Sequence, residues 1–313
     1  MTILVASKGM DPAAWMAALQ AADPARRIIT LADWAGEPLD YVVAWNADPA
    51  VFPQFAGIKV LFSLGAGVDH LLAHADKLPD CPVVRIADPD LTHRMSEWVV
   101  LQALFHHRQG LALQADQKAA HWSNRPQAAA HEAQVGILGY GNLGRDAAAK
   151  LGMMGFQICA WSRSAKPDAP VPHYHGRDQL GEFLNASDIL VNLLPLTEDT
   201  RHLVTYEMLA QLNRNPELNA PIYINAGRGA TQDEAGILRA LDDGTLAGAS
   251  IDVFGTEPLS SDNPFWRHPK VIVTPHCAAD SSPGPLSRYI MGQIDAFEAG
   301  QPLQNVVDFD RGY

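Results

Sequence analysis

The sequence is poor in cysteine and has no excess of positive charge. Its 313 residues include three cysteines, Cys81, Cys159 and Cys277, and no Cys-x-x-Cys pair. Such a sparse, odd number excludes a disulfide framework and a zinc cage and is typical of a reducing compartment, so we expect a cytoplasmic protein without a metal site. Lysine and arginine number 23 against 35 aspartates and glutamates, a formal net charge of −12. This balance argues against nucleic acid or an anionic membrane as a partner.

Long apolar runs are also missing. No stretch of 18 consecutive apolar residues occurs, which excludes a transmembrane helix. The first five residues read as a strand and lack a basic leader, so no signal peptide is expected. With 47% hydrophobic and 19% charged residues and no internal repeat, the chain has the composition of a globular protein. Its length predicts about two domains.

Short apolar segments alternate with helical patterns along the chain. This alternation predicts an α/β protein with parallel sheets joined by helical crossovers. One long helix over residues 92–120 and a polar linker over 121–134 separate two series of strands, and a final helix over 286–299 follows a loop with two prolines. The expected strands are residues 3–6, 28–30, 42–44, 60–63 and 83–86 in the first series, and 135–138, 157–160, 189–193, 222–225, 249–253 and 271–274 in the second.

The six strands of the second series are enough for a complete doubly wound sheet. We therefore predict two doubly wound, Rossmann-like parallel-sheet domains, one of which is discontinuous. Residues 1–97 and 280–313 are expected to form a substrate domain, and residues 98–279 a dinucleotide-binding domain. The boundary then falls inside the long helix.

A glycine-rich turn follows the first strand of the second series. Residues 135–144 read Val-Gly-Ile-Leu-Gly-Tyr-Gly-Asn-Leu-Gly, which is a strand, a Gly-x-Gly-x-x-Gly turn and the start of a helix. The three glycines permit a tight turn, close approach of a pyrophosphate, and close packing of helix on strand, and the helix N-terminus favours phosphate. We expect a dinucleotide to contact Gly139, Tyr140, Gly141, Asn142, Leu143 and Gly144.

The end of the next strand indicates which dinucleotide binds. NAD sites carry an acidic residue about 20 residues after the glycine turn. Here Trp161-Ser162-Arg163-Ser164 follows the strand, without a carboxylate. Hydroxyl and guanidinium groups suit a 2′-phosphate, so Ser162, Arg163 and Ser164 predict NADP(H) in preference to NAD(H). The alternative is that Arg163 is an ordinary surface charge.

Polar residues follow three later strands. Arg228 comes after the strand at 222–225, Glu257 after that at 249–253, and His276 after that at 271–274. Open parallel sheets bind their ligands at the carboxyl ends of the strands. We therefore expect these three side chains to form one site.

The order Arg, Glu, His, with spacings of 29 and 19 residues, resembles the D-isomer-specific 2-hydroxyacid dehydrogenase family. The segments at 65–69, 194–197 and 252–254 match that family as well. Within it, the segments at 64–69, 161–164, 266–269 and 311–313 are most similar to the NADPH-dependent glyoxylate/hydroxypyruvate reductase A group. The resemblance covers nearly the whole chain and implies an oxidoreductase that converts glyoxylate to glycolate and hydroxypyruvate to D-glycerate.

The three residue types suit the reduction of a 2-keto acid. His276 is expected to donate a proton to the developing alkoxide as a general acid. Glu257 is expected to orient the imidazole and to favour its charged form. Arg228 is expected to hold the substrate carboxylate and polarise the keto oxygen. The alternative is that each residue has a purely structural role; Glu257, for example, could be an ordinary loop carboxylate.

The resemblance implies further contacts. Asp252 would hold the nicotinamide carboxamide, although it could instead cap a turn. Trp45 would form a wall of the substrate pocket, although it could instead pack the domain. Backbone N–H groups of the loop after residue 63 would bind the other side of the substrate carboxylate. The remaining residues expected at the site are Gly65, Ala66, Gly67 and Val68 for the substrate and Leu194, Pro195 and Ala226 for the cofactor.

Other features are expected to be structural. We predict that His106 and His107 lie on a solvated helix face rather than at a metal, and that Cys277 only fills space. The resemblance implies a homodimer that uses the long helix and the arm after it. Three alternatives stay open: a dehydrogenase for a bulkier 2-keto acid, a dinucleotide-sensing binding protein, and an enzyme that oxidises formate or phosphonate on the same scaffold.

Overall fold

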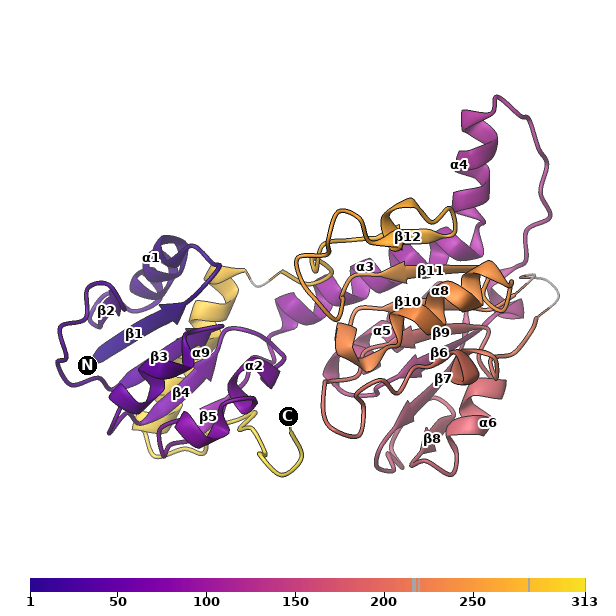
Figure 1. Cartoon of the computed structure of the whole chain (residues 1–313). Coiled ribbons are helices and arrows are strands. Elements are labelled where there is room, and N and C mark those ends of the chain that lie inside the picture. Colours follow the sequence, from indigo (N-terminus) through magenta and orange to yellow (C-terminus); the bar gives the residue numbers. More distant parts are fainter. Residues whose placement is uncertain (216–217, 219, 281, 313) are drawn as a thin grey trace. The chain divides into compact units, whose positions relative to one another are not determined.

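The computed structural model describes residues 1–215, 218, 220–280 and 282–312, and it divides the chain into two compact units (Figure 1). The discontinuous unit comprises Met1–Leu91 and Asp280–Tyr313, and the continuous unit comprises Thr92–Ala279. Each is built around one parallel sheet, which confirms the predicted fold class. It stays a prediction that the discontinuous unit binds substrate and that the continuous unit binds the dinucleotide.

The discontinuous unit has a five-stranded sheet in the order β2-β1-β3-β4-β5. Helices α1 (Pro12–Ala22) and α9 (Pro283–Glu298) cover one face, and the short helices η1 (Pro49–Gln54) and α2 (Asp69–Leu72) pack on the other. Both faces are therefore buried, which explains why the strands are nearly all apolar. The strands are β1 (Thr2–Ser7), β2 (Arg27–Thr30), β3 (Tyr41–Trp45), β4 (Val60–Ser63) and β5 (Val83–Val84).

Helix α9 begins earlier than expected. The sequence placed Pro283 and Pro285 in a loop before a helix at 286–299, whereas both prolines lie in the first turn of α9. The N–H groups of a first turn have no partner within the helix, so proline is tolerated there.

The continuous unit has a seven-stranded sheet in the order β12-β11-β10-β9-β6-β7-β8 (Figure 1). Helices α3 (Pro89–His107) and α5 (Asn142–Met153) cover one face. Helices α6 (Leu180–Asn185), α7 (Tyr206–Leu209) and α8 (Glu234–Asp242) cover the other. The strands are β6 (Gln134–Leu138), β7 (Gln157–Ser162), β8 (His173–His175), β9 (Ile189–Asn192), β10 (Ile222–Asn225), β11 (Gly248–Ile251) and β12 (Val271–Val273).

Strand β8 is not among the six strands that the sequence predicts for this series. Its three residues, His-Tyr-His, show no apolar run, and it pairs only with β7 at the edge of the sheet. The order of the strands reverses between β6 and β9, and such a switch point is where open α/β sheets bind ligands.

The predicted single helix over 92–120 was wrong. It is broken into α3 and α4 (Gly110–Lys118) at Gln109, which adopts a left-handed conformation with φ of 56°. A Cβ at Gly110 would lie 2.5 Å from the ring of Phe105, so a glycine here lets that ring pack on the turn. The expected linker contains one short helix, η3 (Ala130–Glu132), before β6 begins at Gln134.

The prediction that the two histidines at the end of α3 lie on a solvated face was also wrong, because both are buried. His106 Nε2 lies 2.8 Å from Ser250 Oγ of β11, and the His107 ring packs edge-on against Phe156. Burial lowers the pKa of His106 to about 4, so its imidazole is neutral at physiological pH. Among the described residues, no His, Cys, Asp and Glu side chains gather as a metal would require, and no helix has the length and apolarity to cross a membrane.

Candidate active site

The glycine turn between β6 and α5 has the shape of a phosphate cradle. Gly139 has φ of 107°, a conformation that favours glycine, and a Cβ at Gly144 would lie 2.1 Å from the Gly139 carbonyl oxygen. At Gly141, by contrast, an added Cβ would meet no described atom within 4 Å. The open space lies at the N-terminus of α5, a helix of 12 residues. The residues present therefore fit a pyrophosphate.

The non-glycine residues of this turn differ in what they offer a ligand. The Tyr140 side chain is buried in the core, with the Arg145 guanidinium 5.1 Å from its ring centroid. Leu143 also packs against this core, whereas Asn142 is exposed at the first position of α5. We therefore expect Tyr140 to contact a dinucleotide through its backbone.

Ser162 is the last residue of β7, and the exposed Arg163 and Ser164 follow it. Its hydroxyl lies 2.9 Å from the Ser164 carbonyl oxygen and 2.8 Å from His173 Nε2. The sequence reading missed His173 because it missed β8. Hydroxyl, guanidinium and imidazole groups fit the 2′-phosphate of NADP better than a free ribose hydroxyl.

A buried network of amides and hydroxyls fixes the ends of β9 and β10. Asn192 and Asn225 face each other in register, and each side-chain oxygen accepts a backbone N–H two residues on, from Leu194 and from Gly227. Gln232 bonds to Asn225 at 2.7 Å and to the Val253 carbonyl at 3.1 Å. The sequence analysis did not predict this network. The feature that could have indicated it is the asparagine at the end of each of these two successive strands.

The network places the expected cofactor residues of these loops. The side chains of Leu194 and Ala226 are buried, and Pro195 is half-buried. These residues therefore offer a dinucleotide mainly their backbone atoms and, at Pro195, the exposed part of the ring.

The Asp252 carboxylate is buried and holds the loop that carries His276. It accepts hydrogen bonds from the Thr274 hydroxyl at 2.5 Å and from the N–H groups of Cys277 and Ala278 at 3.0 Å. Its own carbonyl accepts the His276 N–H at 2.8 Å. The carboxylate thus positions the loop, and its expected contact with the nicotinamide stays a prediction. The side chain of Cys277, expected to fill space, is exposed.

The structure brings His276, Glu257 and Arg228 together. His276 Nδ1 lies 2.7 Å from Glu257 Oε2, and Glu257 Oε1 accepts the Phe254 N–H at 2.9 Å. His276 has φ of 54°, an unusual conformation for a side chain this large, of the kind that concentrates at functional sites. Arg228 directly precedes η5 (Gly229–Thr231), and its carbonyl accepts a hydrogen bond from the Thr231 hydroxyl. The positive charge of Arg228 acts to lower the pKa of both His276 and Glu257.

The hydrogen bond between His276 and Glu257 sets their charges. It raises the pKa of His276 above its usual value, against burial and the charge of Arg228, which both act to lower it. Burial acts to raise the pKa of Glu257, but the hydrogen bonds from His276 and the Phe254 N–H outweigh it and lower that pKa. The contact therefore favours the charged forms, an imidazolium beside a carboxylate, and leaves Nε2 as the position from which a proton can leave.

Replacing Glu257 by glutamine is expected to move the pH dependence of reduction. The imidazolium of His276 is present below its pKa and is lost as pH rises through it. Without the carboxylate that pKa falls, so the alkaline limb of kcat should shift to lower pH by roughly one to two units. The measurement is kcat between pH 5.5 and 9.5.

Glu234→Gln is the matched control, because Glu234 Oε1 accepts the Gly255 N–H at 2.8 Å without a histidine partner. An unchanged limb in Glu257→Gln, or an equal shift in both variants, would contradict the assignment.

The substrate residues expected on the discontinuous unit lie at the ends of β3 and β4. A Cβ at Gly65 would lie 2.2 Å from Trp45 Cζ3, so the indole packs directly on the backbone of this loop. The His70 ring also lies beside the indole, with ring centroids 4.9 Å apart. The Trp45 ring is thus fixed by the loop. Ala66 and Gly67 are half-buried, and the Val68 side chain is buried.

Not every N–H group of this loop is available to an anion. The Gly65 N–H donates to Ser63 Oγ at 3.3 Å, and α2 has only four residues. The substrate contacts proposed for the loop therefore rest on the residues after Gly65.

Residues 100–278 match the model of the "D-isomer specific 2-hydroxyacid dehydrogenase, NAD binding domain". A glyoxylate/hydroxypyruvate reductase A from Klebsiella pneumoniae (strain 342) is 36% identical over 318 aligned residues, which cover 100% of both chains.

Two solved structures are similar over the whole chain. One is an NADPH-dependent glyoxylate/hydroxypyruvate reductase from Sinorhizobium meliloti in complex with NADP and sulfate, 46% identical with a TM-score of 0.94 over 100% of this chain and 99% of that one. The other is a probable 2-hydroxyacid dehydrogenase from Rhizobium etli in complex with NADP, HEPES and L(+)-tartaric acid, 42% identical with a TM-score of 0.93 over the same shares.

Proposed function

Because the chain belongs to the D-isomer-specific 2-hydroxyacid dehydrogenase family, we propose that it is an NADPH-dependent reductase of small 2-keto acids. Glyoxylate, reduced to glycolate, and hydroxypyruvate, reduced to D-glycerate, are the proposed substrates. The observation that carries the proposal is the His276–Glu257 pair at 2.7 Å with the charge of Arg228 beside it, at the carboxyl ends of the strands that follow the dinucleotide turn.

Arg228 supplies the positive charge that binds the substrate. A guanidinium holds a carboxylate through two parallel hydrogen bonds and can also polarise the adjacent keto oxygen. This local charge is needed because the protein as a whole carries a formal charge of −12, which repels an anionic substrate. The proposal keeps Ala66, Gly67, Val68 and Trp45 as further substrate contacts, and gives Gly65 the part of the backbone on which the Trp45 indole packs.

His276 supplies the proton. NADPH, when bound, provides the hydride for the keto carbon. The imidazolium donates its Nε2 proton to the oxygen as negative charge develops there, and Glu257 stabilises the charged ring and fixes its orientation through Nδ1. In the reverse direction the neutral imidazole takes the proton from the hydroxy acid. The residues around Gly141 and Ser162 are the ones we propose hold the cofactor.

Initial rates with NADPH and, separately, NADH test this function. Glyoxylate, hydroxypyruvate, pyruvate and phenylpyruvate are offered in parallel at pH 7, and the loss of the reduced nicotinamide is followed by its absorbance. We expect fast turnover of the two proposed acids with NADPH and slower turnover with NADH. Fast turnover of phenylpyruvate alone would move the specificity to bulky acids. Tight NADPH binding without turnover of any acid would favour a dinucleotide sensor.

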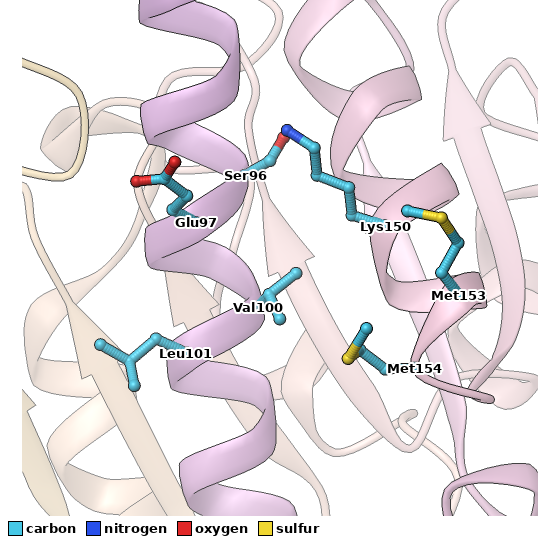
Figure 2. A pocket seen from close by; sticks show the side chains of 7 residues that line it. All are labelled: Ser96, Glu97, Val100, Leu101, Lys150, Met153 and Met154. Atoms are coloured by element: carbon cyan, nitrogen blue, oxygen red, sulfur yellow. The ribbon is translucent and has the colours of Figure 1, made fainter.

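We also propose that two copies of the chain associate through α3, α4 and the arm that follows. Apolar side chains are exposed here, among them Leu101 at 58% and Trp122 at 98%. Figure 2 shows the adjoining pocket between α3 and α5, where Val100, Leu101, Met153 and Met154 stand around an open space. A second copy is the proposed occupant because this is the region that the family resemblance implies for a homodimer. Light scattering should then give twice 33.9 kDa.

The proposed location is the cytoplasm. It rests on the cysteines: Cys81, Cys159 and Cys277 are all free thiols, as expected in a reducing compartment.

A further inference from the structure

The edge strand β8 places two histidines beside the end of β7. Strand β8 lies beside β7 (Figure 1), where His175 pairs in register with Ser162 and His173 pairs with Ala160. Residues two apart on a strand point to the same face, so both imidazoles lie on the side of Ser162. Their rings are stacked, with centroids 6.4 Å apart and planes within 6°.

The hydrogen bonds around Ser162 indicate which nitrogen of His173 carries the proton. A serine hydroxyl has one hydrogen, and here it is donated to the Ser164 carbonyl oxygen at 2.9 Å. The contact of 2.8 Å with His173 Nε2 must then be a bond in which Nε2–H donates to Ser162 Oγ. In the neutral ring Nδ1 therefore holds the lone pair and is the nitrogen able to take up a second proton.

Cations surround His173. Its ring lies 5.7 Å from that of Tyr140, and the Arg145 guanidinium lies 5.1 Å from the same Tyr140 ring. Burial, and then the charges of His175, Lys166 and Arg145, lower the pKa of His173 below its usual value. The one carboxylate that the described contacts place in this group is Asp168, 3.8 Å from Arg145 and largely exposed. In the free protein, burial and the neighbouring positive charges therefore disfavour the charged form of the His173 imidazole.

We propose that His173 is a binding residue for the 2′-phosphate of NADP(H), and that it becomes protonated when this phosphate binds beside Ser162. The proposal rests on the proposed cofactor. A phosphate dianion cancels the repulsion from the neighbouring cations and stabilises the imidazolium, so the proton is taken up from solvent at Nδ1 while Nε2–H keeps its bond to Ser162. Selectivity for the phosphorylated cofactor then increases as pH falls.

The test compares two probes, 2′,5′-ADP and 5′-AMP, which differ only in the 2′-phosphate. Isothermal titration calorimetry of the full chain at pH 6.5 and 8.5 measures the ratio of their affinities. An opposite charge within about 4–6 Å raises a pKa by 1–3 units, so we expect this ratio to be roughly five- to tenfold larger at pH 6.5. The phosphate itself titrates near pH 6 and acts in the opposite sense, because it gains charge as pH rises.

Three variants assign the effect to His173. His173→Gln keeps a donor for Ser162 but cannot be charged, so its ratio should be low and nearly equal at the two pH values. His173→Lys carries a fixed charge, so its ratio should stay high at both. His131→Gln, an exposed histidine in η3 before the amino end of β6, should behave as the unmodified protein. Buffers of different ionisation enthalpy should detect proton uptake with 2′,5′-ADP and none with 5′-AMP.

The outcomes separate this inference from the function on which it rests. If 2′,5′-ADP binds better than 5′-AMP but the ratio does not change with pH, or changes equally in His173→Gln, the role of His173 is refuted and the NADP preference stands. If 2′,5′-ADP binds no better than 5′-AMP at either pH, the NADP preference itself is refuted.

Discussion

Replacing His276 by asparagine should lower kcat for keto-acid reduction by roughly 10²- to 10⁴-fold, the usual contribution of a general acid. Asparagine is chosen because it tolerates the left-handed conformation that His276 adopts, with φ of 54°. Its side-chain N–H is also able to donate to Glu257 as Nδ1–H does. What the variant lacks is the second nitrogen, from which the proton leaves.

The loss should appear in kcat and leave cofactor binding unchanged. Titration of NADPH by fluorescence and a thermal melt should both match the unmodified protein, because the loop is held by the Asp252 carboxylate rather than by the imidazole. The alkaline limb of the pH profile should disappear together with the activity. A variant with kcat within threefold of the original would remove His276 from the mechanism.

Arg228→Ala should lower kcat/KM for glyoxylate by about 10²- to 10³-fold, since a charge-assisted contact to a carboxylate contributes several kcal/mol when its partner is removed. The rise in KM should carry much of this loss, because the guanidinium binds the ground-state carboxylate. A fall in kcat should accompany it, because the same charge polarises the keto oxygen. Steady-state kinetics separate the two contributions.

Arg228→Lys tests geometry against charge. Lysine keeps the positive charge but not the planar fork, so it should recover only part of kcat/KM. Arg239→Ala is the matched control: it removes a cation of the same unit that lies in the last turn of α8, 3.8 Å from the Tyr206 ring centroid. Equal losses in Arg228→Ala and Arg239→Ala would mean that only net charge matters. No loss in Arg228→Ala would exclude it as the carboxylate ligand.

The pattern of apolar segments was sufficient to predict most of the fold. Strands such as Ile222–Asn225 and Val60–Ser63 were recognised at their observed bounds, because strands buried on both faces must be almost wholly apolar. The same logic failed for β8, an edge strand of His-Tyr-His, and for the break at Gln109 between α3 and α4. Neither feature has a periodic apolar pattern in the sequence. Strand β8 forms by pairing with β7, and the break at Gln109 is accompanied by the packing of Phe105 on Gly110.

The residues of the site divide in the same way into those that the sequence predicts and those that only the tertiary structure reveals. Residue types and their order along the chain were enough to nominate the glycine turn, Ser162, Arg228, Glu257 and His276, because these chemistries require particular side chains after particular strands. The burial of His106, the turn of the Asp252 carboxylate toward the His276 loop, and the contact of His173 with Ser162 could not be read in this way. Each depends on a partner 11 to 144 residues away in sequence. Local composition carries no information about such pairs, and only the packing of strands and helices brings them within hydrogen-bonding distance.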